Sequence, residues 1–136
     1  QFENYVGMLL GKPAESCDMT GQCARQYVVE ADGSVFPCDF YCMDGYRLGN
    51  LTTDSFEELD RRREATGFVQ ASLEIDEQCR ACEYYSLCRA GCRRHRDEHG
   101  AIRHNRFCEA YRVFFKHAWP TLHTIAQRMA SRSGPA

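Results

Sequence analysis

The sequence lacks a long hydrophobic run and a strong charge of either sign. The apolar segment near the N-terminus, residues 2–10, is too short to span a membrane and has no basic leader, so it predicts neither an anchor nor a signal peptide. The formal net charge is −2 and the sequence pI is about 6.2. This balance provides no overall attraction to nucleic acid or to an anionic membrane, and we expect neither as a partner.

The one sizeable basic run is short and is neutralised by its neighbours. Residues 93–96 read Arg-Arg-His-Arg, and Asp97 and Glu98 follow at once. Such mixed charge favours a solvated loop beside an anionic centre over a nucleic-acid site.

The number of cysteines is odd, so they cannot all form pairs within one chain. The chain has nine cysteines and no export signal, which argues against a disulfide framework. We therefore expect reduced thiols and a cytoplasmic location. The chain also starts without an initiating methionine, at Gln1, which predicts a fragment of a longer protein.

The cysteines themselves are the most informative feature that is present. Eight of them divide evenly into two sets of four, and four of the eight form the run C-x2-C-x5-C-x3-C over residues 79–92. Coordinated thiolates are soft ligands that select zinc, copper(I) or iron–sulfur clusters. Two four-thiolate metal centres are therefore predicted, from Cys17, Cys23, Cys38, Cys79, Cys82, Cys88, Cys92 and Cys108, with Cys42 left over.

The spacing leaves both zinc and iron–sulfur clusters open. Zinc ribbons use two C-x2-C pairs, but this chain has only one, at Cys79 and Cys82. The intervals of five and three residues that follow are typical of cluster proteins, in which the last cysteine of a run can bind the neighbouring cluster. The spacing favours clusters, and a zinc-stabilised binding module is the alternative.

Local patterns predict a small α+β, cysteine-rich metal-cluster domain with loop-wrapped clusters. A helix is expected over residues 2–9, ending at Gly11 and Pro13. Residues 26–30 and 34–38 flank Asp32-Gly33, which predicts one β-hairpin. Residues 43–53 read as a loop, and the run of cysteines predicts loops and single turns.

Two further helices are predicted. The middle one covers residues 54–64, with Asp54 and Glu57 as a capping pair and Gly67 as the stop. Ion pairs Glu57–Arg61 and Glu58–Arg62 would support it. The C-terminal one carries apolar stripes at residues 107–118 and 122–129, with Pro120 between them, so we expect it to be kinked or broken near Trp119.

The complete cysteine pattern resembles the signature of SPASM domains, the auxiliary-cluster domains of many radical S-adenosylmethionine enzymes. The resemblance rests on seven cysteines and Gly33, and it covers nearly the whole chain. The eighth cysteine, Cys17, and the segments at residues 26–33, 37–41, 48–51 and 107–111 are similar to one branch, the anaerobic sulfatase-maturating enzymes. The resemblance implies three parts: a helix at 1–13 leading from a missing radical domain, the SPASM domain at 14–130, and a tail at 131–136.

The resemblance also implies the ligands and the chemistry. Two 4Fe–4S clusters would serve electron transfer, and an unfolded sulfatase segment would have its cysteine or serine oxidised to formylglycine. The chain's own radical domain and an electron-acceptor protein would be further partners. The first cluster would use Cys17, Cys23, Cys38 and Cys92, and the second would use Cys79, Cys82, Cys88 and Cys108.

The chain departs from a complete enzyme in one respect. Radical chemistry in this superfamily needs C-x3-C-x2-C, but Gly45 and His95 stand where the third cysteine would be. S-adenosylmethionine and a third cluster would therefore belong to the missing part, and the fragment alone would not be catalytic. A fragment handled in air could hold zinc. A SPASM domain serving another peptide modification is a further alternative.

Apart from the metal ligands, four kinds of residue have more than one possible role. Asp39 follows the ligand Cys38 and is implied to be the base that deprotonates substrate; the alternative is a turn residue. Phe40 and Tyr41 would line a peptide groove or pack in the core. Cys42 would be a buried free thiol, a substitute ligand or a product of oxidation. The histidines are expected at the surface or beside the ligands.

Overall fold

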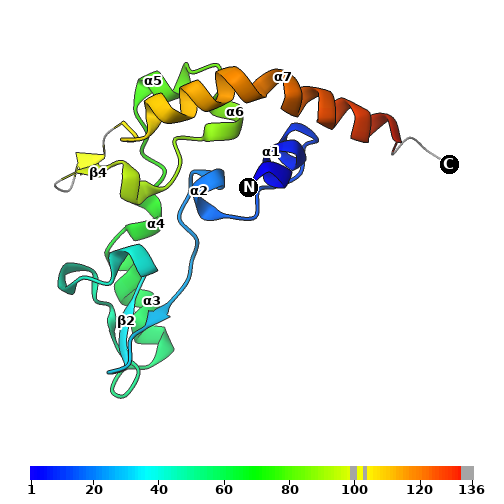
Figure 1. Cartoon of the computed structure of the whole chain (residues 1–136). Helices are drawn as coiled ribbons and strands as arrows, with labels where there is room; N and C mark the ends of the chain where they lie inside the picture. Colours follow the sequence, from blue (N-terminus) through cyan, green and yellow to red (C-terminus); the bar gives the residue numbers. More distant parts are fainter. Residues whose placement is uncertain (99–100, 103, 133–136) are drawn as a thin grey trace. The chain divides into compact units, whose positions relative to one another are not determined.

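The chain forms two compact units built from helices and short antiparallel strands (Figure 1). The computed structural model describes residues 1–98, 101–102 and 104–132, without the side chains of 97–98 and 101–102. One unit combines Gln1–Gln22 with Ile75–Ala136, and the other is Cys23–Glu74. We call them the terminal unit and the middle unit. The mixture of helix and strand confirms the expected α+β class.

The terminal unit is mainly helical. Its longer helices are α1 (Phe2–Leu9) and α7 (Cys108–Arg132), and α1 confirms the predicted N-terminal helix. Single turns form α2 (Cys17–Thr20), α5 (Glu77–Arg80), α6 (Tyr85–Cys88) and the 3-10 turn η3 (Arg93–His95). Strands β4 (Asp97–Glu98) and β5 (Ala101–Ile102) pair antiparallel. The expectation of single turns around the cysteine run is confirmed.

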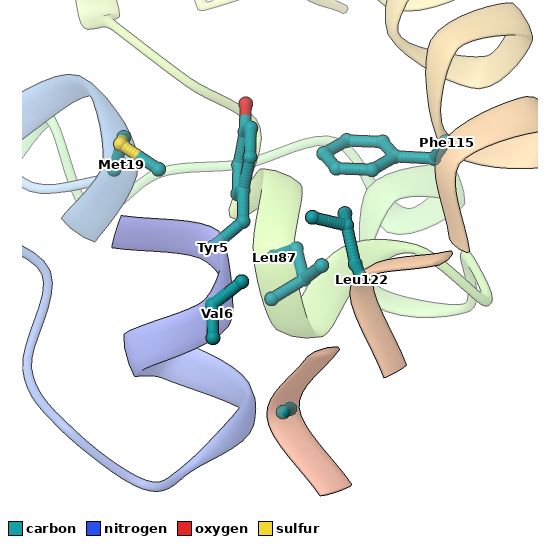
Figure 2. Packing of buried hydrophobic residues seen from close by; sticks show 7 residues of the cluster. Tyr5, Val6, Met19, Leu87, Phe115 and Leu122 are labelled. Atoms are coloured by element: carbon teal, nitrogen blue, oxygen red, sulfur yellow. The ribbon is translucent and has the colours of Figure 1, made fainter. Parts of the chain in front are cut away.

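Aromatic side chains fill the core of this unit (Figure 2). Phe115 of α7 is fully buried, and the Tyr5 ring of α1 meets it edge-on at 5.2 Å between centroids. Tyr84, just before α6, stacks on Phe115 at 5.7 Å. Large buried rings stabilise a core both by the area they bury and by their edge and stacking contacts. The cluster thereby joins α1, α6 and α7, and it consists of Tyr5, Val6, Met19, Leu87, Phe115, Leu122 and Ala126.

Helix α7 continues through Pro120, so of the two alternatives expected near Trp119 the break is wrong, while the kink stays a prediction. An internal proline removes one backbone bond and costs about 3 kcal/mol. Phe115 before it and Leu122 after it belong to the same buried cluster, and burial of such side chains contributes energy of a similar size. The helix runs to Arg132, and the remainder of the predicted tail, residues 133–136, lies outside the described part of the chain.

The middle unit contains a three-stranded antiparallel sheet and two helices. The predicted hairpin is confirmed as β1 (Val28–Val29) paired with β2 (Ser34–Phe36). Strand β3 (Gly49–Asn50) pairs with the other edge of β2, so the prediction of a plain loop at 43–53 is wrong. That segment also contains the 3-10 turn η2 (Asp44–Tyr46). A strand of two residues is too short to show alternation. It pairs through backbone bonds from the Leu48 N–H to the Val35 carbonyl and from the Leu51 N–H to the Gly33 carbonyl, at 2.8 and 2.9 Å, and the Asn50 side-chain amide also donates to the Asp32 carbonyl at 2.8 Å.

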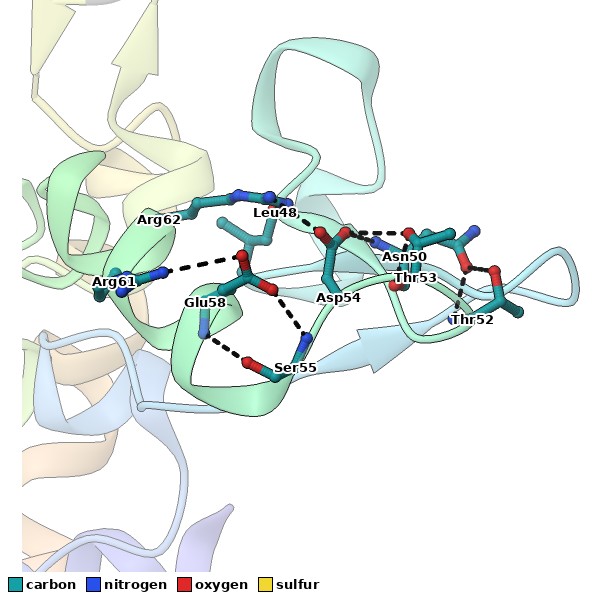
Figure 3. A network of polar contacts seen from close by, with 9 residues as sticks. All are labelled: Leu48, Asn50, Thr52, Thr53, Asp54, Ser55, Glu58, Arg61 and Arg62. Carbon is teal, nitrogen blue, oxygen red and sulfur yellow. Dashed lines mark hydrogen bonds and ion pairs between the residues drawn. The ribbon is translucent and has the colours of Figure 1, made fainter.

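The N-cap of helix α3 (Phe56–Ala65) is Ser55, one residue later than the predicted cap Asp54 (Figure 3). Ser55 forms the capping box with Glu58, while Asp54 instead accepts from the Asn50 backbone and from Arg62, at 2.8 and 2.9 Å. The predicted capping pair is therefore wrong. The predicted ion pairs are replaced too: Arg61 lies 3.8 Å from Glu58, and Arg62 pairs with Asp54. Asp54 reaches Arg62 from outside the helix, a contact that helical spacing does not reveal.

The remaining elements of the middle unit follow α3 and the hairpin. Gly67 has a φ of 58° and follows the last turn of α3, as predicted for the stop. Helix α4 (Phe68–Ala71) comes next, and the 3-10 turn η1 (Asp39–Tyr41) follows β2.

The basic run at 93–96 is not a fully solvated loop. Arg96 is only 1% exposed, and its guanidinium donates to the Gly21 carbonyl at 3.4 Å. Part of the run therefore belongs to the interior of the terminal unit. No helix in the described ranges combines the length and apolar character that crossing a bilayer would need.

Candidate metal centre

Four of the predicted ligands line one pocket in the terminal unit. Cys79 lies on α5, Cys82 three residues further on, Cys88 at the end of α6, and Cys108 at the start of α7. The pocket has a volume of about 320 Å³. The fold thus brings together thiols that are far apart in the sequence, since Cys79 and Cys108 are 29 positions apart. These are the members of the second predicted set, which we call the second thiol set.

Local backbone geometry presents these thiols to the pocket. Asp76 caps α5 by accepting from the Gln78 backbone at 2.8 Å, and the Cys82 N–H donates to the Cys79 carbonyl at 3.2 Å. After Cys88 the chain takes three consecutive left-handed residues, with φ of 47°, 65° and 66° at Arg89, Ala90 and Gly91. This rare conformation turns the Ala90 N–H onto the Cys88 sulfur.

A buried asparagine fixes this left-handed segment to the start of α7. Asn105 is 3% exposed, and its amide donates to the Ala90 carbonyl at 2.8 Å. Its side-chain oxygen accepts from the Phe107 N–H, and its carbonyl accepts from the Cys108 N–H, both at 2.8 Å. One side chain therefore couples the segment after Cys88 to the segment that carries Cys108.

The thiols in the pocket favour binding to a positive centre. Burial, together with repulsion from the neighbouring thiolates of Cys108, Cys79 and Cys82, raises the pKa of Cys88 to about 11. Burial followed by repulsion from Cys108 likewise raises the pKa of Cys79, and burial followed by Glu109 raises that of Cys108. Since thiolates this close repel one another, a cationic metal centre is the partner that permits all of them to lose their protons.

Two residues of the first predicted thiol set lie in the terminal unit and two lie in the middle unit, so each pair is described by itself. In the terminal unit, the Cys17 thiolate is close enough to raise the pKa of Cys92, after burial, and Cys92 accepts from the Arg94 N–H. In the middle unit, Cys23 and Cys38 belong to one hydrophobic cluster with Tyr41 and Phe68. The grouping of Cys17, Cys23, Cys38 and Cys92 into one site stays a prediction.

The cysteines are not joined by disulfides, and the described residues form no ready-made site for a single metal ion. All nine cysteines lie in the described part of the chain, and none forms a disulfide. Among the described residues, no group of three or more histidine, cysteine, aspartate or glutamate side chains is arranged to hold a single metal ion.

Asp39 lies at the surface beside a predicted ligand. It is exposed, it begins η1, and its Oδ1 lies 3.2 Å from the Cys38 sulfur, which donates as a thiol. A metal-bound thiolate has no proton to donate, so ligation would free this carboxylate. This contact tests neither the prediction that Asp39 is the catalytic base nor the alternative that it is a turn residue.

The residues after Asp39 divide between surface and core. Phe40 is 58% exposed, whereas Tyr41 is 1% exposed and meets the Phe68 ring edge-on at 4.9 Å. Tyr41 is therefore a core residue, and Phe40 alone is available at the surface. Cys42 is a free thiol, half-buried rather than buried, and it donates to the Cys38 carbonyl at 3.7 Å.

A comparison with protein families identifies the domain. Residues 17–83 match the model of the SPASM family, described as an iron–sulfur cluster-binding domain. The chain carries a SPASM domain. The matched range begins at Cys17 and includes Cys23, Cys38, Cys79 and Cys82.

Known proteins similar to this SPASM domain are sulfatase-maturating enzymes. The chain is 43% identical, over 90% of its length, to the cysteine-type anaerobic sulfatase-maturating enzyme of Clostridium perfringens, and it spans 33% of that protein. The solved structure of native anSMEcpe with bound AdoMet superposes with a TM-score of 0.84 at 41% identity, covering 94% of this chain and 36% of that one. The form with bound AdoMet and Cp18Cys peptide gives 0.82 at 40% identity, covering 94% and 36%.

The structure adds residues that the sequence did not single out. His104, Arg112 and Glu83 line the pocket of the SPASM domain together with the second thiol set. Asn105 has no sequence signal, because isolated asparagines are usually exposed. His104 had only the general expectation that a histidine lies at the surface or beside a ligand.

Proposed function

We propose that this chain is the auxiliary-cluster and substrate-binding part of an anaerobic sulfatase-maturating enzyme. It would hold two 4Fe–4S clusters, one on the second thiol set and one on Cys17, Cys23, Cys38 and Cys92. The observation that carries the proposal is the convergence of Cys79, Cys82, Cys88 and Cys108 on one pocket. The relatives point to the enzyme class, and the cysteine-type relative favours cysteine over serine as the target.

The second thiol set fits a cluster better than a zinc ion. Four thiolates hold zinc at about 2.3 Å, which leaves room for a single atom between them. Among the described residues, no group of three or more such side chains is arranged around a single ion, although the four cysteines line one pocket of about 320 Å³. A centre of several irons and sulfides uses that space. Bound by four thiolates, such a centre offers no open position to substrate and supplies electron transfer.

The chain's own contribution to the reaction would be proton removal and substrate binding. Asp39 is exposed next to Cys38 and would accept the proton that the substrate side chain loses as it is oxidised to formylglycine. The exposed Phe40 ring would contact the unfolded sulfatase segment. The peptide-bound relative supports a peptide substrate. The radical domain and an electron-acceptor protein would be the other partners, and the cytoplasm the location.

Anaerobic metal analysis tests the proposal directly. The protein is purified without oxygen, reconstituted with iron and sulfide, and analysed for iron, sulfide and zinc. We expect about eight irons and eight sulfides per chain, four of each for each cluster. Replacing Cys88 with alanine should remove about half of both. A protein that retains zinc under these conditions and takes up no sulfide would be the zinc-stabilised binding module instead.

A further inference from the structure

Among the histidines in the described part of the chain, His104 reaches a thiol of the pocket. Its Nδ1 lies 3.8 Å from the Cys79 sulfur, and the residue lines the same pocket as the second thiol set. Cys79 is 8% exposed, so the contact is sheltered from water on the sulfur side. This distance suits an N–H···S hydrogen bond, because sulfur is larger and its bonds are longer than those of oxygen.

The backbone around His104 is held in place on its C-terminal side. Asn105 is anchored through its side chain to Ala90 and Phe107, and the Arg106 N–H donates to the His95 carbonyl at 3.0 Å. These bonds fix the chain from which the imidazole extends. A buried polar network therefore supports the position of His104 beside Cys79.

We infer that His104 donates its Nδ1–H to the Cys79 sulfur and thereby sets the reduction potential of the centre on the second thiol set. This inference rests on the proposed function, since it requires an iron–sulfur centre there. A donor to a ligand sulfur stabilises the extra negative charge of the reduced centre more than that of the oxidised one. His104 is thus a positioning and tuning residue, and the four thiolates remain the ligands.

The test measures one centre at a time. A Cys23→Ala/Cys38→Ala background removes two thiols of the first set, so that only the second centre contributes to the signal. In this background we compare the parent with His104→Leu, which removes the donor, and with His104→Asn and His104→Gln. Asparagine places its amide N–H near the position of Nδ1, whereas glutamine carries it one bond further. His117→Leu, at an exposed histidine of α7 outside the pocket, is the matched control.

Three readouts are used: iron and sulfide content, the midpoint potential from an EPR-monitored redox titration, and the proton and nitrogen couplings in pulsed EPR of the reduced centre. We expect unchanged iron in all variants. The potential should shift to more negative values in His104→Leu and His104→Gln, return most of the way in His104→Asn, and stay unchanged in His117→Leu. The couplings assigned to the imidazole should disappear in each His104 variant.

Other outcomes overturn the inference in distinguishable ways. An unchanged potential in His104→Leu or equal potentials in the asparagine and glutamine variants would show that His104 does not donate to Cys79. Loss of iron from both amide variants would make His104 a ligand. If the parent itself binds no iron and sulfide, the proposed function fails first. Should His104→Leu not fold, the asparagine and glutamine pair still decides, because the two differ only in where the donor lies.

Discussion

At the scale of single residues, the structure separates thiols that share a sequence context. Cys38 and Cys42 are four positions apart, yet only Cys38 is buried in the hydrophobic cluster of the middle unit, against which the partly buried Cys23 packs. Cys42 lies at the end of η1 and is half-buried beside Glu30, which raises its pKa after the effect of burial. Spacing alone does not show that the predicted ligand Cys38 and its neighbour Cys42 differ in burial.

Replacement of Cys42 should leave the metal content unchanged. Cys42→Ala removes a thiol that is not needed to complete two sets of four. We expect iron and sulfide equal to those of the unmodified protein after anaerobic reconstitution, while Cys88→Ala in parallel loses about half, as expected for one of two equal clusters. A loss of about four irons in Cys42→Ala would instead place Cys42 among the ligands.

Asp39 provides the residue-scale test of catalysis. In the full-length enzyme, Asp39→Asn keeps the size of the side chain but removes its ability to accept a proton. We expect formylglycine formation to fall by about 10²–10⁴-fold, the usual contribution of a general base. Mass spectrometry of a cysteine-containing sulfatase peptide measures the product.

Two controls accompany the Asp39 variant. Cleavage of S-adenosylmethionine should continue, because it belongs to the part of the enzyme outside this chain, and iron content should not change. Product formation at the unmodified rate would leave Asp39 as a turn residue only. Asp44→Asn, in η2 of the same unit, is a comparison at an acidic residue that is not bonded to a cysteine sulfur.

At the scale of elements, the left-handed segment between Cys88 and Cys92 adopts an energetically unfavourable backbone conformation. Arg89 and Ala90 adopt positive φ although neither is glycine, at a cost of about 1–2 kcal/mol each. Asn105 holds the segment from one side, and its amide would lie 2.6 Å from a Cβ added at Gly91. The element is therefore shaped for its thiols at the expense of local backbone energy.

Gly91→Ala should destabilise the terminal unit more than an equivalent change at Gly11. Both glycines have positive φ, 66° and 77°, but a Cβ at Gly11 would meet nothing within 4 Å. Gly11→Ala should cost about 1–2 kcal/mol from the backbone alone. Gly91→Ala should cost about 1–3 kcal/mol more, because it displaces the buried Asn105 amide. Anaerobic denaturant unfolding of the metal-loaded variants measures both, and equal losses would contradict the role given to Asn105.

At the scale of the whole molecule, the aromatic core and the thiol-rich segment around α5 differ in what stabilises them. The terminal unit has an aromatic core that joins both ends of the chain, since α1 and α7 contribute Tyr5 and Phe115. Its segment around α5 has little core of its own, because Cys79 is the only buried residue in that helix. Isolated helices shorter than about 12–15 residues are marginal in water, so α5 depends on other contacts.

Removal of metal should therefore loosen α5 before the aromatic core. After anaerobic chelation, amides of residues 77–82 should exchange with solvent faster, while those of α7 around Phe115 keep most of their protection. The reason is that metal ligation contributes folding energy only where ligands are held by it. Hydrogen exchange with mass spectrometry measures this, and α3 is the internal control because its capping box and buried Leu59 use no thiol. Uniform loss of protection across α5, α7 and α3 would contradict the prediction.

The sequence by itself determined the parts that depend on local chemistry or on residue type. The thiols and their SPASM pattern follow from residue type and spacing. The Asp-Gly hairpin, helix α1 and the stop at Gly67 follow from residues close together in the chain. Backbone preferences and soft-ligand chemistry act over a few positions and can be read without a fold.

Only the tertiary structure decided which long-range contacts prevail. Pro120 stays inside one helix because Phe115 and Leu122 are buried in a common core, and Asp54 leaves the cap because Arg62 and the Asn50 backbone bind it. The approach of His104 to Cys79, the anchoring of Ala90 by Asn105, and the burial of Arg96 likewise join distant positions. Such contacts have no periodicity in the sequence, since they arise from packing in three dimensions.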